Sequence, residues 1–178
     1  MSLKSIALAA AMTALAASAG FAATVQNGSF EDVSGLANSG LNHGNFGVYN
    51  TIPGWTTASG SGIELQNNAT LGEADAQDGN WYVELDSHAN SSMYQDITFA
   101  KAGVYALSFW YAPRTSTPND NGITYSLGDL VWGQIDDVYP SSWREVTSQF
   151  TVANAGDTLR LTFAADGTSN SLGGFIDN

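Results

Sequence analysis

The stretch "GVYALSFWYAP", residues 103–113, decides the fold class of this chain. Alternate side chains of an extended segment point to opposite faces. One face would carry Tyr105, Leu107, Phe109 and Tyr111, and the other Val104, Ala106, Ser108 and Trp110. Because both faces are largely apolar, we expect a central strand that is covered on both sides, or whose second face meets a ligand.

Six further segments have the same short, β-rich character. They are "WYVELD" (81–86), "SMYQDITF" (92–99), "GITYSLG" (122–128), "EVTSQFTV" (145–152), "TLRLTFAAD" (158–166) and "GGFIDN" (173–178). Gly, Ser, Asn and Asp recur between them, and no amphipathic helix of useful length follows residue 22. The pattern predicts an all-β fold, an antiparallel β-sandwich, with one wall of its core made by Phe150, Val152, Leu159, Leu161 and Phe163.

Residues 1–22 have the layout of a secretory signal peptide. Lys4 precedes a run rich in Ala, Leu, Ile and Met, and small residues lead up to Ala22. The run is too short and too rich in alanine for a membrane span, and no other segment approaches that length. We therefore expect an exported chain, secreted or held at the cell surface, with no membrane span.

Residues 23–178 have the size of one domain, and no shift in composition marks a second one. Within it, residues 32–62 are rich in Gly and Asn and are expected to form a long functional or packed loop. The segment "GGFIDN" stops in what reads as the middle of a strand. We expect the domain to be truncated at its last strand, with a few strand residues following Asn178.

The charge of the expected domain is strongly negative. All 17 acidic residues lie after residue 22, with only four cations, which gives a net charge of −13 and no cysteine. Such a surface repels nucleic acid and anionic lipid, which bind through Lys and Arg. Its acidity either favours solubility outside the cell or provides ligands for cations.

The order of several motifs resembles a known group of proteins. The motifs are "NGSFE" (27–31), "GW" (54–55), "DGNWYVELD" (78–86), "SMYQDI" (92–97), "GVYALSFWYAPR" (103–114) and "GGFIDN" (173–178). Together they resemble the galactose-binding-like β-sandwiches, which include many carbohydrate-binding modules. They are especially similar to secreted domains of unknown function in plant cell walls and bacterial surface proteins. The resemblance covers nearly all of residues 25–178 and implies a jelly roll.

The resemblance also implies a structural calcium where the first and last strands meet. Its ligands would be the carboxylates of Glu31 and Asp177, with main-chain oxygens near Ser29 and after Gly44. Calcium takes six to eight oxygens in irregular geometry, which suits such a set. Alternatively, both are solvated carboxylates at strand ends. Beside Glu31 as a calcium ligand, Asp32 is expected to be a solvated bystander, while Phe30 would bring the first strand into the core.

Aromatic and polar residues together indicate a site for sugar, whose apolar faces stack on rings while its hydroxyls need polar partners. We expect most aromatic residues to be core. The candidates that neighbour polar turns are Trp110, Tyr111, Arg114, Asp120 and Asn121 in "WYAPRTSTPNDNG" (110–122), and Trp132 in "DLVWGQIDD" (129–137). For Arg114, an ordinary salt bridge to a nearby acid is the competing interpretation.

Catalysis finds little support in the sequence. His43 and His88 lie in loop-like segments, and neither belongs to a recognisable nucleophile or zinc-protease motif. We expect a non-catalytic module that binds a polysaccharide or a cell-surface glycan. The alternative is a structural or adhesive component of the surface or biofilm matrix, in which the acidic surface supports self-association through divalent ions. A glycoside hydrolase is the least favoured reading.

Overall fold

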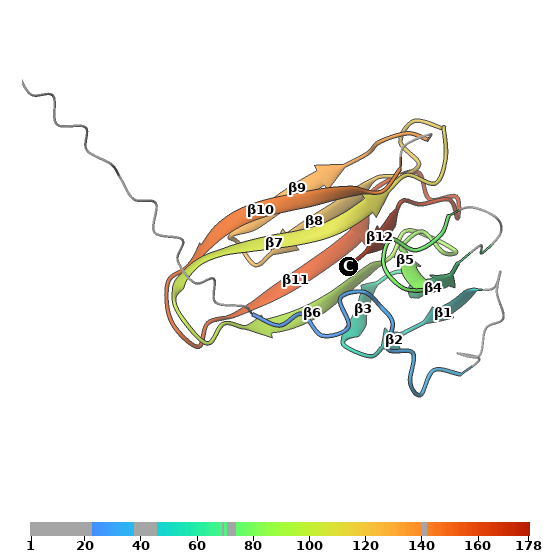
Figure 1. Cartoon of the computed structure of the whole chain (residues 1–178). Helices are drawn as coiled ribbons and strands as arrows, with labels where there is room; N and C mark the ends of the chain where they lie inside the picture. The colour runs from blue at the N-terminus through green and yellow to red at the C-terminus, as the bar shows by residue number, and fades with distance from the viewer. Residues whose placement is uncertain (1–22, 38–45, 69, 71–73, 140–141) are drawn as a thin grey trace, which may run out of the picture.

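The computed structural model describes residues 23–37, 46–68, 70, 74–139 and 142–178 (Figure 1). The expected signal peptide at residues 1–22, His43 and the main-chain oxygens expected directly after Gly44 lie outside the described residues. Within that part of the chain, no helix has the length and apolarity that a membrane crossing requires.

Twelve strands form two antiparallel sheets of six strands each. The first sheet has the order β1 (Phe46–Tyr49), β4 (Ile63–Asn67), β5 (Trp81–Glu84), β12 (Phe175–Asp177), β7 (Gly103–Ala112), β10 (Arg144–Val152). The second has the order β2 (Thr51–Ile52), β3 (Trp55–Ser59), β6 (Ser92–Thr98), β11 (Thr158–Ala165), β8 (Ile123–Leu127), β9 (Val131–Ile135). The predicted all-β sandwich is confirmed.

The core lies between the two sheets and is rich in aromatic rings. The Phe163 ring on β11 lies 4.9 Å from Phe109 on β7 and 5.8 Å from Trp55 on β3, centroid to centroid. Phe30 extends this row, with its ring 5.9 Å from that of Trp55. Edge and tilted contacts of this kind are the favoured geometries of aromatic pairs. Of the expected core wall, all residues are buried except Leu159, which is half-buried.

Seven strands fall where the alternating segments place them, and five others were not predicted. Strands β1, β2 and β3 lie within residues 32–62, so the expectation of one long loop there is wrong. Strand β4 was missed although Ile63, Glu64, Leu65 and Gln66 alternate between apolar and polar, and the two polar side chains are buried as well. Strand β9 was missed because it is short and is interrupted by Gly133.

Strand β7 has a neighbouring strand on each side, as a central strand does. The expectation that both of its faces are covered is wrong. Its inward face is buried, whereas Ala106 and Ser108 are exposed and Val104 has 63% of its surface accessible to solvent. Strand β10 pairs with β7 from Gly103 to Tyr111, while β12 pairs only with Trp110–Ala112.

The motif "NGSFE" is a turn rather than the start of a strand. Asn27 and Phe30 adopt the left-handed region, with φ of 49° and 57°, and the Phe30 amide donates to the Asn27 carbonyl. The indole Nε1 of Trp55 donates to the same carbonyl at 3.1 Å. The turn therefore directs the buried Phe30 ring into the core, as predicted, without a strand to carry it.

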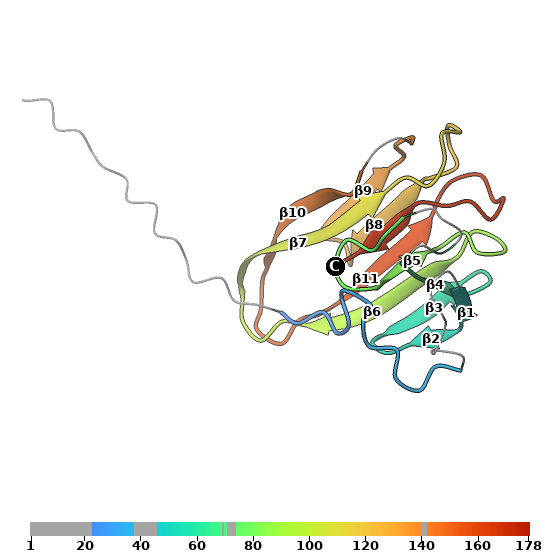
Figure 2. The ribbon, with the colours of Figure 1, turned by 45° about the vertical axis from the view of Figure 1, so that its right-hand side comes forward.

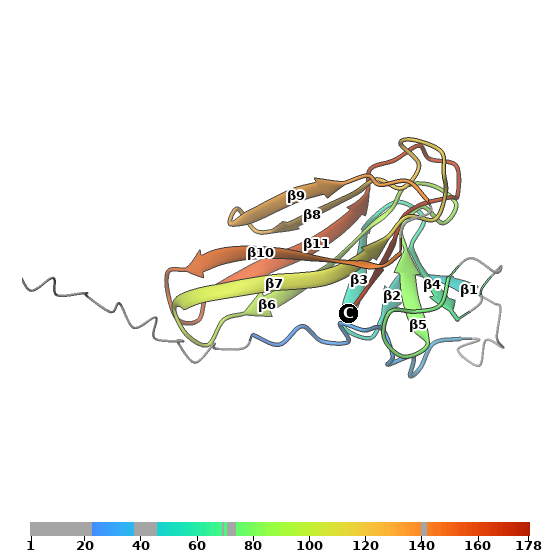
Figure 3. The same cartoon turned by 45° about the horizontal axis from the view of Figure 1, so that its top comes forward.

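The short strands β1 to β5 gather at one end of the molecule, and β7 and β10 extend to the other (Figures 1 and 2). The connections after β7, between β9 and β10 and before β12 come together at the end of the sandwich opposite the turn between β10 and β11 (Figures 2 and 3). This gathering of loops positions Arg114, Asp120 and Asn121.

Candidate functional site

One candidate site is a corner where the segment before β1 and strand β12 meet. Glu31 Oε1 accepts hydrogen bonds from the amides of Asn80 and Trp81 at 2.7 and 2.8 Å. A Cβ on Gly79, whose φ is +66°, would lie 2.3 Å from the Glu31 carboxyl carbon. Only glycine therefore allows the loop to close over the carboxylate.

Asp177 holds the other side of the same loop. Its Oδ2 accepts from the amides of Gln77 and Asp78 at 2.8 and 3.0 Å, and Oδ1 accepts from Asn178. The pKa of Asp177 is raised to about 6, mainly by burial and in smaller part by the negative charge of Glu31. The hydrogen bonds from the three amides act in the opposite direction and lower it. We call Glu31, Asp177 and the loop Gln77–Trp81 the terminal corner.

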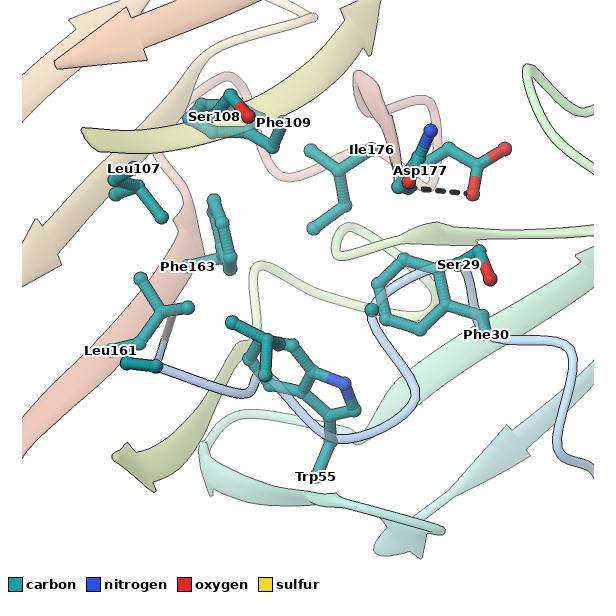
Figure 4. Close-up of a pocket in the computed structure, with 14 residues that line it drawn as sticks. Ser29, Phe30, Trp55, Leu107, Ser108, Phe109, Leu161, Phe163, Ile176 and Asp177 are labelled. Carbon is teal, nitrogen blue, oxygen red and sulfur yellow. Dashed lines mark hydrogen bonds between the residues drawn. The ribbon is translucent and has the colours of Figure 1, made fainter. Parts of the chain in front are cut away.

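The corner has the donor chemistry of a hard-cation site, with only two carboxylates. Among the described residues, no hydrogen bond reaches Glu31 Oε2, and no group of three or more His, Cys, Asp or Glu side chains is placed to hold a metal. A cation there would therefore need main-chain oxygens as well. Ser29 and Asp177 line one hollow (Figure 4).

Asp177 is buried, so the competing picture of two solvated carboxylates does not describe it. Asp32, in contrast, is exposed, and its Oδ1 accepts from the amide of Ser34 at 3.0 Å. Hydrogen bonds from the side chain and the main chain of Ser34 lower the pKa of the Asp32 carboxyl. The adjacent acids Glu31 and Asp32 thus have different roles, one in the corner and one in its own turn.

Four of the six predicted sugar-binding residues come together, but as buried scaffold: Tyr111, Arg114, Asp120 and Asn121. Asn121 Oδ1 accepts from the amides of Arg114 and Thr115 at 2.8 and 2.9 Å. The Tyr111 hydroxyl donates to the Asn121 carbonyl at 3.1 Å. Asn121 and Tyr111 therefore shape the loop after β7 from within.

Asp120 ties this loop to the segment before β12. One carboxylate oxygen accepts from the Thr115 hydroxyl at 3.1 Å, and the other from the Asn170 amide side chain at 3.0 Å. The Asn170 main chain in turn donates to Asp86 at 2.8 Å. Asp120 and Asn121 thus lie in the interior and join loops, instead of facing a ligand as predicted.

Arg114 is held by a buried carboxylate. Its Nη1 lies 2.7 Å from Glu84 Oε2, and the two side chains are 6% and 0% exposed. Gln66 Nε2 donates to the same oxygen at 2.7 Å and to Glu64 at 2.8 Å. Burial raises the pKa of Glu84 to about 8, although the Arg114 guanidinium opposes this. The salt bridge, the competing interpretation for Arg114, is present.

A groove lies on the outer face of the first sheet, beside this scaffold. Its volume is about 290 Å³, and its lining includes Asp75, Arg114, Tyr139, Trp143 and Phe175. Trp143 is fixed by an Nε1 hydrogen bond to the Asp75 carbonyl at 2.8 Å, whereas 55% of Tyr139 is exposed. We call these five residues the loop groove. It combines rings and polar groups in one concave place.

The two predicted tryptophans lie elsewhere. Trp132, on the edge strand β9 of the second sheet, is 71% exposed. Trp110 is half-buried on the outer face of β7, opposite Asp177 on one side and Glu145 on the other. The six predicted residues therefore do not form one surface.

Sequence reasoning missed Tyr139 and Trp143 as a pair. The signal was present in "YPSSWR" (139–144), where two aromatic residues enclose turn-forming Pro and Ser. Of the two histidines, His88 lies in the described part of the chain, and it is exposed in the loop after β5.

No family model matches the chain. Among curated proteins, it is similar to part of a multifunctional-autoprocessing repeats-in-toxin protein of Vibrio vulnificus, 33% identical over 127 residues. That match covers 70% of this chain and 2% of the toxin, so the chain spans about 2% of the length of the curated relatives it matches.

Among solved structures, the chain is similar to a family 61 carbohydrate-binding module in complex with β-1,4-galactotriose. The TM-score is 0.51 at 17% identity, over 69% of this chain and 83% of the module. An arabinose-bound GH51 α-L-arabinofuranosidase gives a TM-score of 0.52 at 14% identity, over 88% of this chain and 25% of the enzyme. The fold is that of the carbohydrate-binding modules, as the sequence motifs predict.

Replacing Gly79 tests whether the loop closes on Glu31. Gly79→Ala should lower the free energy of unfolding because its Cβ displaces the carboxylate from two main-chain amides. Gly35→Ala is a matched control, since Gly35 also has a positive φ, +76°, but nothing within 4 Å of the added Cβ. In urea denaturation we expect Gly79→Ala to cost about 1–3 kcal/mol more than the control. Equal losses would contradict a loop closed over Glu31.

The buried Glu84 predicts a dependence of stability on pH. Its pKa is raised from 4.5 to about 8, so between these values the folded protein keeps a proton that the unfolded chain releases. The free energy of unfolding should therefore fall as pH rises through this window, by at most about 1.4 kcal/mol per unit from this group.

Urea denaturation of Glu84→Gln across the same window isolates this contribution. The variant should show a flatter dependence than the unmodified protein, because the amide carries no titrating proton. Glu145→Gln, which removes an exposed carboxylate, is the control and should keep the original slope. If Glu84→Gln also keeps the original slope of unfolding free energy against pH, Glu84 does not titrate in this window.

Proposed function

We propose that this chain is a non-catalytic, carbohydrate-binding module that recognises glycan in the loop groove and is stabilised by calcium at the terminal corner. The observation that carries the proposal is the grouping of Tyr139 and Trp143 beside Arg114 on a sandwich of the carbohydrate-binding-module type. Sugar sites need a stacking ring and a fixed polar partner in one concave place, and the groove offers both.

Tyr139 is the residue best placed to contact sugar. Its ring is more than half exposed, while its main-chain amide is fixed by the Thr115 carbonyl at 2.8 Å. Trp143 packs edge-on against Tyr82, with ring centroids 6.0 Å apart, so it forms a rigid wall. Arg114 is pre-oriented by Glu84, which lowers the entropic cost of its use in binding.

The volume of the loop groove limits the size of the ligand that it can hold. A volume of about 290 Å³ lies at the small end of ligand sites. Such a groove fits one or two sugar rings, as at a chain end or a branch of a polysaccharide or cell-surface glycan.

Calcium is the cation that suits the terminal corner. Glu31 and Asp177 would supply carboxylate oxygens, and main-chain oxygens near Ser29 would add to them. The raised pKa of Asp177 reflects a buried negative charge that a cation would compensate. Bound calcium would join the segment before β1 to β12 and thereby make the domain more rigid.

An extracellular or cell-surface location fits this function. It is supported by the signal-peptide layout of residues 1–22 and by the similarity to part of a toxin. A structural or adhesive role, in which divalent ions join copies through the acidic surface, is the second candidate, supported by the net charge of −13 for residues 23–178.

Glycan binding is tested by affinity electrophoresis and calorimetry against soluble galactans, arabinans, mannans, xylans and exopolysaccharide fractions, with calcium present. Tyr139→Ala should weaken binding about 2- to 12-fold, the loss expected for one aromatic contact of about 0.5–1.5 kcal/mol. Trp132→Ala removes an exposed ring from the other sheet and serves as the matched control.

The variants also locate the site if the groove is wrong. Loss of binding in Trp132→Ala with none in Tyr139→Ala would move the site to the second sheet. If the unmodified protein binds none of these polysaccharides, the proposed carbohydrate-binding function is ruled out.

Calcium binding is tested by thermal unfolding with calcium, with magnesium and with EDTA. Calcium at about 100 times its Kd should stabilise the fold by about 2.7 kcal/mol, a rise of several degrees in Tm. Asp177→Asn and Glu31→Gln should abolish the rise, whereas Asp32→Asn, the adjacent exposed acid, should keep it.

Identical melting temperatures in calcium and in EDTA would rule out the proposed calcium site. Sedimentation in the same calcium series separates the second candidate function. Assembly that EDTA reverses would favour the adhesive role over glycan recognition by single domains.

A further inference from the structure

Strand β10 forms a long free edge of the first sheet. Within the described residues it pairs only with β7, from Arg144 opposite Tyr111 to Val152 opposite Gly103. In an antiparallel strand the main-chain groups point alternately to its two sides, so about half of those on β10 face away from β7. In the described part of the chain, no main-chain to main-chain hydrogen bond outside this pairing involves β10. The outward groups form a ladder that another strand can join.

The other three edges of the two sheets, as far as the structure describes the chain, are short. Strands β1, β2 and β9 have four, two and five residues, whereas β10 has nine. Proteins also protect sheet edges with charged residues, proline or β-bulges. Residues 146–152, "VTSQFTV", contain no charged residue and no proline, and the register with β7 runs without a shift. The edge of β10 therefore lacks the usual protection against pairing.

The core beneath this edge is already closed. Val146 and Phe150 are buried, and the Tyr125 hydroxyl of β8 lies 3.5 Å from the Ser148 hydroxyl. Gly133 on β9 leaves room for the Tyr125 ring, since a Cβ there would lie 2.3 Å from it. The edge therefore needs no side chain from a partner to complete the core. It offers main-chain groups, and the partner that matches them is a strand.

We propose that β10 pairs with β10 of a second copy of this chain, antiparallel and about a two-fold axis at Ser148. Ser148 is the middle residue of β10, so this register pairs all nine residues. Inward Val146 would then lie opposite Phe150 of the second copy, and outward Thr147 opposite its Gln149. Inward side chains meet inward ones and outward meet outward, as a continuous sheet requires.

The distribution of charge favours the same register. Residues 23–178 carry a net charge of −13, so two copies repel one another wherever their acidic surfaces meet. Residues 146–152 provide a strip along which the copies approach without charged side chains. Glu145 would lie opposite Thr151 of the second copy, and Arg144 opposite its Val152. No two like charges therefore face one another across the axis.

The dimer would have a consequence for binding. Pairing would join the two first sheets, six strands from each copy, into one continuous sheet. Because the two-fold axis is perpendicular to that sheet, both outer faces, each with its loop groove, would lie on the same side. This consequence rests on the proposed function: two grooves could then bind one polysaccharide with avidity. The pairing itself requires neither glycan nor divalent ions.

Sedimentation equilibrium in EDTA, without glycan, measures the pairing independently of both candidate functions. The unmodified protein should form a dimer that becomes tighter as the concentration of sodium chloride rises, because salt screens the repulsion between acidic copies. A chain that stays monomeric at every salt concentration, up to millimolar protein, would overturn the proposal. Loss of glycan or calcium binding would leave this result unchanged.

Two double variants test the register. Thr147→Lys with Gln149→Lys places lysine opposite lysine in both outward pairs, whereas Thr147→Glu with Gln149→Lys places glutamate opposite lysine. The first should dimerise about 10-fold more weakly than the second, although it lowers the net negative charge by two. Both positions are exposed, so the fold should be kept, which circular dichroism checks. Equal dissociation constants would overturn the proposed pairing.

Cross-linking gives a second test, because the chain contains no cysteine. Thr147→Cys mixed with Gln149→Cys should yield a disulfide-linked dimer, since opposite residues have Cα atoms about 4.5–5.5 Å apart. Each variant by itself should not, because its two cysteines would lie two residues out of register and more than about 7 Å apart. No cross-link in the mixture, or equal cross-linking of either variant by itself, would overturn the register.

Discussion

The loop end of the sandwich depends on one buried ion pair, Arg114 with Glu84. One oxygen of Glu84 lies 2.7 Å from the guanidinium, and the other accepts the amide of Gly173. Strand β5, the loop after β7 and the segment before β12 therefore meet at one carboxylate. Removing either side chain would leave buried polar atoms of the other without this hydrogen bond, typically at a cost of about 1–3 kcal/mol. The pair thus fixes the walls of the loop groove before any ligand arrives.

The acidic composition of the chain has a structural use beyond solubility. Glu31, Glu84, Asp86 and Asp177 each accept hydrogen bonds from main-chain amides of loops far away in the sequence. A carboxylate accepts several such bonds at once, which makes it an efficient tie between loops. In a domain without cysteine, these ties act at the places where a secreted protein often uses disulfides.

The sequence predicts the long strands well because their alternation reflects burial on one face. Strand β4 also alternates, from Ile63 to Gln66, but nothing in the sequence shows that its polar face is buried, since Glu64 is a residue type that usually indicates solvent. The pairing of Glu31 with Asp177 was available only through resemblance to other proteins. The role of Gly79 was not predictable, since the approach of one distant carboxylate leaves no local pattern. Tyr111 and Asn121 illustrate the remaining limit, because aromatic and polar neighbours look the same in sequence whether they serve a ligand or a loop.

The terminal corner has a mechanical consequence. Glu31 and Asp177 lie far apart in the sequence, yet both hold the same short loop, Gln77–Trp81. A pulling force applied through the chain on either side would therefore act first on this corner and only later on the long pairing of β7 with β10. The corner is then the element that yields first under tension, and the resistance of the fold to pulling would depend on those few carboxylate contacts.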